Sequence, residues 1–269
     1  MTRHITFAAA LALALTAAAP ARAESEQLVS VRTARGATQA FILIKPDKPV
    51  ASVILFAGGD GVLGLTGASS MRSLAKNFLV RTRAMFAAHG LMVAVADAPS
   101  DHQQGMNAIF RMGAAHAGDI GAIAAYLKKA APVPVWLVGT SMGTFSAAEG
   151  ALAGYADGLV LTSTITHSPP RWEIAQREPH GVASMPLSRI TVPTLILAHR
   201  HDGCPSSPPD GAALLKQRLT GAKTVDVVML DGGDPPISKP CQARAQHGYL
   251  GIEATAVAAI AAFITANSR

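Results

Sequence analysis

Residues 133–153 read VPVWLVGTSMGTFSAAEGALA and predict a strand, a sharp turn and a helix in direct succession. The apolar run at 135–138 is typical of a buried strand, and an alanine-rich helical pattern follows Gly143. Ser141 stands at the apex of the turn. Gly139 and Gly143 lack Cβ atoms, so strand and helix can pass close together there. The serine hydroxyl would project at the C-terminal edge of a sheet, beside a helix N-terminus that favours negative charge.

The same turn matches the G-x-S-x-G pattern of a nucleophilic serine. The strand before it and the helix after it are the context that this pattern requires. Serine is also a preferred residue at the N-cap of a helix, so a capping role in a Gly-rich turn is the alternative interpretation of Ser141. The two interpretations can be distinguished, because only a nucleophilic serine needs a base close to it.

The first 23 residues have the pattern of a secretory signal peptide. Arg3 supplies a positive charge, residues 5–19 are apolar, and Ala21-Arg22-Ala23 is a small-x-small cleavage site. Cleavage after Ala23 would leave one domain at 24–269, in the periplasm or outside the cell. No other run approaches the length of a membrane span. The two cysteines of an exported chain, Cys204 and Cys241, predict one disulfide.

The composition argues against several partners. The formal net charge is +6, but the basic residues are scattered and aromatic residues make up only 5% of the chain, so a nucleic-acid surface is not expected. The cysteines have no partners at zinc spacing, so we expect no metal.

Residues 59–64 form a G-x-G-x-x-G after a strand, a pattern typical of dinucleotide-binding oxidoreductases. No acidic residue lies near twenty positions further on, and we expect no cofactor.

Strand and helix patterns alternate along the rest of the chain. Two short runs at 28–33 and 39–45 predict an antiparallel hairpin. Buried-strand patterns follow at 51–57, 91–96, 135–138, 159–165, 192–198 and 225–230, and helical patterns at 77–89, 119–130, 211–219 and 250–266. Asp119 would lie in the first turn of its helix, and residues 100–115 would form a loop. This alternation predicts an α/β fold, a doubly wound and mostly parallel sheet without a separate cap domain.

Three loops that follow strands carry a serine, an acid and a histidine in that order. Ser141 follows the strand at 135–138, Asp202 follows the strand at 192–198, and His247 lies beyond the last strand. The carboxyl ends of parallel strands share one edge of a sheet, so we expect the three to converge. A histidine can take the serine proton, and a carboxylate on its other nitrogen fixes the tautomer. Surface-loop roles are the alternatives for Asp202 and His247.

With these motifs, the chain resembles the α/β-hydrolase superfamily, in particular serine esterases and dienelactone hydrolases. The resemblance covers nearly the whole of residues 24–269 in topology, but only these motifs in residues. It implies an oxyanion hole formed by the N–H of Met142 and an N–H from Gly58 or Gly59. The usual His-Gly is absent there, since the sequence reads Ala57-Gly58-Gly59-Asp60, and Asp60 stays a third candidate. The Cys204–Cys241 disulfide would tie the acid loop to the histidine loop.

The resemblance implies a carboxylic-ester hydrolase that works through an acyl-enzyme on Ser141. Ester, thioester, lactone and amide substrates share this chemistry and are all open. The segment 167–189 is the only candidate lid, and its shortness predicts an open site for small or medium acyl groups. We expect a monomer with a small-molecule substrate. A non-catalytic binding protein on the same fold is the main alternative. For Asp60, His102 and His167 two interpretations stay open: they line the substrate pocket, or they are ordinary loop residues.

Overall fold

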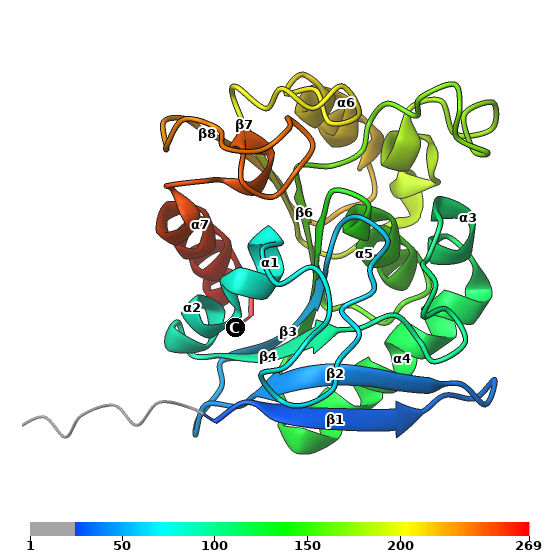
Figure 1. The fold of residues 1–269 in the computed structure, drawn as a ribbon, viewed down its shortest axis with the longest axis vertical. Helices are drawn as coiled ribbons and strands as arrows, with labels where there is room; N and C mark the ends of the chain where they lie inside the picture. Colours follow the sequence, from blue (N-terminus) through cyan, green and yellow to red (C-terminus); the bar gives the residue numbers. More distant parts are fainter. Residues whose placement is uncertain (1–24, 269) are drawn as a thin grey trace, which may run out of the picture.

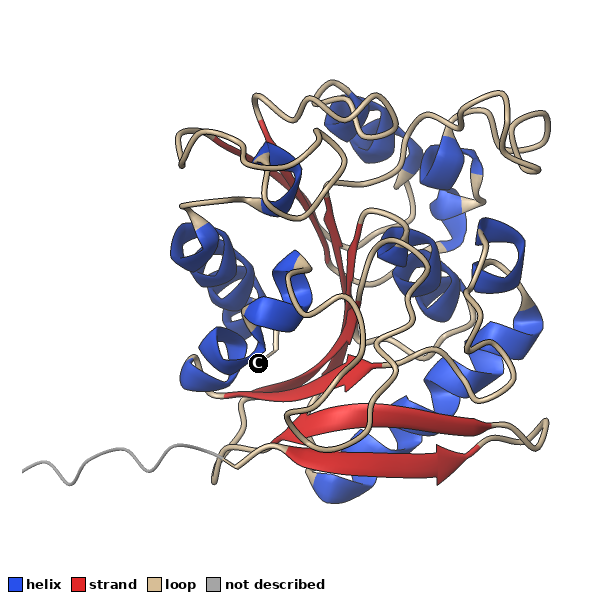
Figure 2. Ribbon diagram, in the orientation of Figure 1, coloured by secondary structure: helices blue, strands red, loops and turns tan. Residues whose placement is uncertain are grey.

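The computed structural model describes residues 25–268, so the predicted signal peptide at 1–23 lies outside the described residues. Figures 1 and 2 show a twisted sheet with helices on both faces. The strands are β1 (Gln27–Arg32), β2 (Thr38–Ile44), β3 (Ala51–Phe56), β4 (Leu91–Ala96), β5 (Val135–Thr140), β6 (Gly158–Thr162), β7 (Thr194–His199) and β8 (Val225–Leu230). The helices are α1 (Phe78–Arg81), α2 (Arg83–Ala88), α3 (Ala108–Arg111), α4 (Ala114–Ala130), α5 (Gly143–Leu152), α6 (Gly211–Arg218) and α7 (Glu253–Ala266).

The eight strands form one sheet in the order β1-β2-β4-β3-β5-β6-β7-β8. β1 and β2 form the predicted antiparallel hairpin, β2 also runs antiparallel to β4, and the other neighbours are parallel. The strand order reverses between β3 and β5. The carboxyl end of β5 therefore lies at a crevice of the sheet, where open α/β folds bind ligands. The predicted fold class is confirmed.

Two apolar cores lie on the two faces of the sheet. α4, α5 and α6 cover one face, packing Ile120, Phe145 and Leu215 against it. α1, α2 and α7 cover the other, where Phe78 and Ile260 are among the buried side chains. Strands β3, β4, β5 and β6 are buried along their whole length, which explains their continuous apolar sequences.

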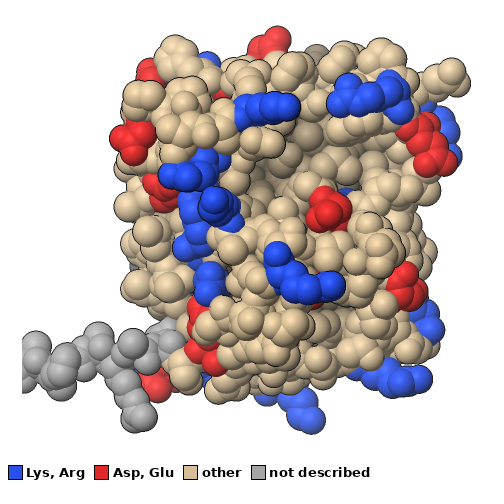
Figure 3. Space-filling view, in the orientation of Figure 1, with Lys and Arg blue, Asp and Glu red and all other residues tan. Residues whose placement is uncertain are grey.

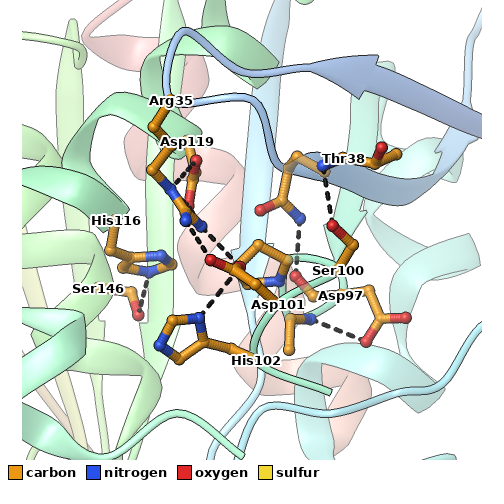
Figure 4. Close-up of polar contacts among 12 residues, drawn as sticks. Arg35, Thr38, Asp97, Ser100, Asp101, His102, His116, Asp119 and Ser146 are labelled. Carbon is orange, nitrogen blue, oxygen red and sulfur yellow. Dashed lines mark hydrogen bonds and ion pairs between the residues drawn. The ribbon is translucent and has the colours of Figure 1, made fainter.

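The prediction of a loop at 100–115 was partly wrong. α3 occupies Ala108–Arg111, and α4 begins at Ala114, five residues before the predicted start. Asp119 therefore lies inside a helix, fully buried, and not in a first turn as predicted. It accepts hydrogen bonds from the Arg35 guanidinium, which also pairs with Asp101 (Figure 4). A buried carboxylate is stable there because an arginine neutralises it.

Two other helices differ in their bounds. The predicted helix at 77–89 is two short helices that meet at Thr82, whose hydroxyl donates a hydrogen bond to the Phe78 carbonyl. The closing helix begins at Glu253 and not at 250. Residues 167–189 contain only two 3₁₀ turns and, within the described residues, do not form a separate cap. None of the helices at 25–268 is long and apolar enough to span a membrane.

Candidate active site

Ser141 lies in a strained turn between β5 and α5. Its φ of 53° is in the left-handed region, which non-glycine residues rarely adopt. The close crossing of strand and helix requires Gly143, since a Cβ there would lie 2.1 Å from the Phe56 carbonyl oxygen. At Gly58 a Cβ would lie 2.9 Å from the Ser141 Cβ, so the loop after β3 approaches the serine closely. The predicted sharp turn is present, with the serine at its apex.

Asp202 and His247 are brought together from two loops. The His247 Nδ1 and the Asp202 Oδ2 are 2.8 Å apart, and both side chains are buried. The second Asp202 oxygen accepts the Cys204 backbone N–H at 2.9 Å. With Nδ1 engaged, the other ring nitrogen, Nε2, is buried and has no hydrogen-bond partner in the described residues. A carboxylate on Nδ1 leaves Nε2 as the nitrogen that can accept a proton.

Ser141 and His247 line the same cavity, which has a volume of about 240 Å³. Gly58, Gly59 and Thr140 form part of its wall, and the rest comes from Phe78 at the start of α1, the segment before it, and residues 241–248. Figure 3 shows this face of the molecule hollowed near its centre, with Lys and Arg side chains scattered around it. The structure thus gathers Ser141, His247, Gly58 and Gly59 at one cavity, with Asp202 behind the histidine.

Two backbone N–H groups beside Ser141 have no partner. Within residues 25–268, neither the Met142 N–H nor the Gly59 N–H makes a hydrogen bond. The Gly58 carbonyl accepts the Gly61 N–H at 3.3 Å, which fixes the peptide that carries the Gly59 N–H. Free N–H groups close to a nucleophile can stabilise a developing oxyanion. The Gly58 and Asp60 N–H groups also have no hydrogen-bond partner in the described residues, so this criterion leaves all three candidates for the second donor open; the bond from Gly61, which fixes the peptide that carries the Gly59 N–H, favours Gly59.

A buried arginine supports the Gly59 peptide from behind. Arg111 of α3 donates to the Gly59 carbonyl at 3.2 Å and to the Ser146 hydroxyl at 2.9 Å. Its side chain is fully buried, and burial lowers its pKa to about 10. Ser146 also contacts His116 Nε2 at 2.9 Å (Figure 4). Burial, and then the charge of Arg111, lowers the pKa of His116 to about 3, so this histidine is neutral.

The histidine loop is held by two residues that the sequence analysis missed. The Ser163 hydroxyl donates to the His247 carbonyl at 2.8 Å, and the Tyr249 hydroxyl donates to the Leu197 carbonyl at 2.9 Å. Both residues have positive φ. Burial raises the pKa of the Tyr249 hydroxyl, which keeps it a donor. Their positions, at the end of β6 and two residues after His247, are the signals that could have identified them.

The predicted disulfide is present between Cys204 and Cys241. Cys204 is buried two residues after Asp202, and Cys241 lines the cavity that holds Ser141 and His247. The bond therefore joins the acid loop to the wall of the cavity.

The remaining candidate residues have structural roles. The Asp60 carboxylate accepts the Val62 N–H at 3.0 Å, which makes it a turn residue. His102 stacks on Phe110 and pairs with Asp101, and His167 is exposed. None of the three lines the cavity with Ser141.

The G-x-G-x-x-G segment has no free amides for a pyrophosphate at its third glycine. The Asp97 carboxylate accepts the N–H groups of Leu63, Gly64 and Leu65 at 2.7–3.1 Å. This explains the glycine pattern as a loop wrapped around Asp97. No group of three or more His, Cys, Asp or Glu side chains at 25–268 is arranged to hold a metal ion.

No protein-family model and no curated protein matches this sequence. Solved structures do match. An esterase of Pyrococcus furiosus superposes with a TM-score of 0.62 at 15% identity, covering 90% of this chain and 93% of that one. Dienelactone hydrolase of Anabaena variabilis gives 0.61 at 14% identity, covering 92% and 100%. An α/β serine hydrolase without lid from Xanthomonas campestris gives 0.55 at 14%, covering 88% and 95%. The chain has the α/β-hydrolase fold.

Proposed function

We propose that this protein is an exported serine hydrolase that cleaves carboxylic esters through an acyl-enzyme on Ser141. The observation that carries the proposal is the buried His247–Asp202 pair: His247 lines the same cavity as Ser141, and its Nε2 has no hydrogen-bond partner in the described residues. In this fold, that combination supports a Ser-His-Asp catalytic triad. A binding protein would have no need of an unpartnered buried imidazole nitrogen beside a strained serine.

The proposed reaction has two halves. His247 Nε2 accepts the Ser141 proton while Oγ attacks the ester carbon, and the oxyanion is held by the N–H groups of Met142 and Gly59. The imidazolium then returns the proton to the alkoxide, which leaves as the alcohol. Water, deprotonated by His247 Nε2, then attacks the acyl carbon; the bond from that carbon to Ser141 Oγ breaks, the imidazolium returns the proton to Oγ, and the acid leaves. Asp202 fixes the tautomer of His247 and stabilises its cation throughout.

Two features support the narrower parts of the proposal, the open site and the export. The short segment 167–189 leaves the site open, which suits esters of small or medium size. The disulfide suits an oxidising compartment, in line with export by the signal peptide predicted at 1–23. Thioesters, lactones and amides pass through the same tetrahedral chemistry and remain candidate substrates within the same proposal.

Hydrolysis of p-nitrophenyl acetate and butyrate tests the proposal. We expect kcat/KM to fall at least about 10³-fold in Ser141→Ala and His247→Gln. Asp202→Asn should lower it by up to about 10⁴-fold, because the tautomer of His247 is then wrong. His167→Gln, which changes an exposed histidine that does not line the cavity, is the matched control and should retain activity. No turnover by the folded, disulfide-bonded wild type would favour a binding protein instead, and ligands would then be sought by thermal shift.

A further inference from the structure

A second cavity lies on the other side of the Ser141 turn. Its volume is about 280 Å³, and it is lined by Asn107, Ala108, Ile109, Met142, Trp172, Glu173 and Ile174. Most of this lining is apolar, and its one charged residue, Glu173, is exposed. Ile109 on α3 is 39% exposed and lies at the rim of this cavity. We call this space the α3 cavity.

The nucleophile stands between the two cavities. Ser141 lines the first, and the next residue, Met142, lines the α3 cavity. The first cavity is built from α1 and residues 241–248, whereas the α3 cavity is built from α3 and residues 172–174. In Figure 1, α1 and α3 lie on opposite sides of the sheet. An ester bound at Ser141 can therefore extend one part into each cavity.

The chemistry decides which part enters which cavity. In the tetrahedral intermediate, the carbon carries the Ser141 oxygen, the oxyanion, the leaving alcohol oxygen and the acyl chain. The leaving oxygen must face His247 to receive its proton, and His247 lines the first cavity. The oxyanion occupies the direction of the Met142 and Gly59 N–H groups. The direction left for the acyl chain is past Met142, toward the α3 cavity.

We propose that the α3 cavity is the acyl site and that this enzyme prefers esters of apolar acids of medium chain length. The inference rests on the proposed serine-hydrolase function and adds the acid half of its substrate. Ile109, Trp172 and Ile174 supply the apolar contacts. The first cavity carries Lys76, Asn77 and Gln242, and suits a more polar alcohol.

The test compares two ester series. In the first, the acyl chain lengthens from acetate through butyrate and hexanoate to octanoate on p-nitrophenol; in the second, the alcohol lengthens from ethyl to hexyl acetate. Each methylene that enters an apolar cavity should raise kcat/KM about fourfold until the space is filled. We expect this rise in the acyl series of the wild type and a flatter alcohol series.

Two bulky substitutions, one in each cavity, distinguish which cavity binds the acyl chain and which binds the alcohol. Ile109→Trp, at an exposed position, should lower the hexanoate-to-acetate ratio of kcat/KM about tenfold or more and leave the alcohol ratio nearly constant. Gln242→Trp, also exposed but in the first cavity, is the matched control and should change the alcohol ratio alone. Trp172→Ala, which enlarges the α3 cavity, should shift the optimum toward octanoate.

The opposite pattern would overturn the acyl site. An acyl ratio that Ile109→Trp leaves unchanged, or that Gln242→Trp lowers instead, assigns the acid to the first cavity. Circular dichroism and fluorophosphonate labelling of each variant confirm that it is folded and that Ser141 is reactive. A wild type that takes the label but shows a flat acyl series contradicts this inference alone. A wild type that neither takes the label nor hydrolyses any ester contradicts the proposed function itself.

Discussion

Arg111 is a fully buried arginine whose guanidinium makes no hydrogen bond to a carboxylate in the described residues. Burying a charge without a paired opposite charge is costly, so its neighbours must supply acceptors. They are the carbonyls of Met106 and Gly59 and the hydroxyl of Ser146. Its hydrogen bond to the Gly59 carbonyl fixes the peptide that follows the Gly59 N–H, a proposed oxyanion-hole donor. We therefore interpret Arg111 as a positioning residue.

Replacing Arg111 should impair catalysis more than binding. Arg111→Met removes the donor to the Gly59 carbonyl, and the resulting displacement of the loop should lower kcat by roughly 10- to 100-fold with a smaller change in KM. Arg111→Lys should recover part of the loss. The measurement is steady-state kinetics on p-nitrophenyl butyrate at a temperature well below the melting point of each variant. The control is Arg83→Met, whose hydrogen bonds go to Glu26 and Val80 instead. A raised KM with an unchanged kcat would contradict a positioning role.

Some of these residue roles are readable from sequence and others are not. Ser141 is marked by two glycines at fixed spacing, and Asp202 and His247 are marked by where they follow strands. Tyr249 could have been identified only by its place two residues after His247, whereas nothing in the local sequence of Arg111 marks its contact with a distant loop. The bond from Arg111 joins residues 52 positions apart.

At the scale of elements, the strands were predicted more closely than the helices. β4 and β8 match their predicted bounds; for β4 the reason is that a continuous apolar run between turn residues defines a buried strand well, whereas β8 is only half-buried and carries the exposed Asp226. The start of α4 was misplaced because Gly118 and Asp119 look like the beginning of a helix, whereas Asp119 is in its interior, paired with Arg35. Tertiary pairing had overridden a local signal. The predicted helix at 77–89 is divided at Thr82, where the Thr82 hydroxyl donates a hydrogen bond to the Phe78 carbonyl, and the helical sequence pattern does not indicate this break.

The Cys204–Cys241 disulfide acts on two elements of the site at once. It closes a loop across a sequence separation of 37, for which the chain-entropy model gives about 4 kcal/mol of stabilisation. The Cys204→Ser/Cys241→Ser variant should lose stability of that order. Its kcat should also fall, because the loops of Asp202 and His247 are no longer tied. Urea titration and ester kinetics, each compared with the disulfide-bonded wild type, measure the two effects, and the chemically reduced wild type should behave like the variant. Equal stability and activity with and without the bond would contradict this role.

The molecule as a whole should lose stability between pH 6.5 and about 4 through His116. Its folded pKa of about 3 lies below the unfolded value, so in this range the unfolded chain binds a proton that the folded chain does not. Stability therefore rises with pH through this window, by up to about 1.4 kcal/mol per pH unit. Below about pH 4, carboxylates such as Asp101, whose pKa the Arg35 guanidinium lowers, begin to contribute in the same direction.

Replacing His116 should flatten that dependence. We expect the unfolding free energy of His116→Gln, measured by urea titration at about pH 7, 5.5 and 4.5, to change less with pH than that of the wild type. His167→Gln, an exposed histidine, should keep the wild-type slope. Identical slopes in the wild type and His116→Gln would show that another group titrates in this window.

The strand order and the course of the chain place the carboxyl ends of β5 and β7 at one edge of the sheet, and the proposed triad depends on that convergence. Its central claim is that Ser141 is a nucleophile activated by His247. The most direct measurement is the intact mass of the folded, disulfide-bonded protein after reaction with a fluorophosphonate, followed by peptide mapping. We predict a single adduct on Ser141 that is absent from Ser141→Ala. No adduct on the wild type, or an adduct that persists in Ser141→Ala, would contradict the claim.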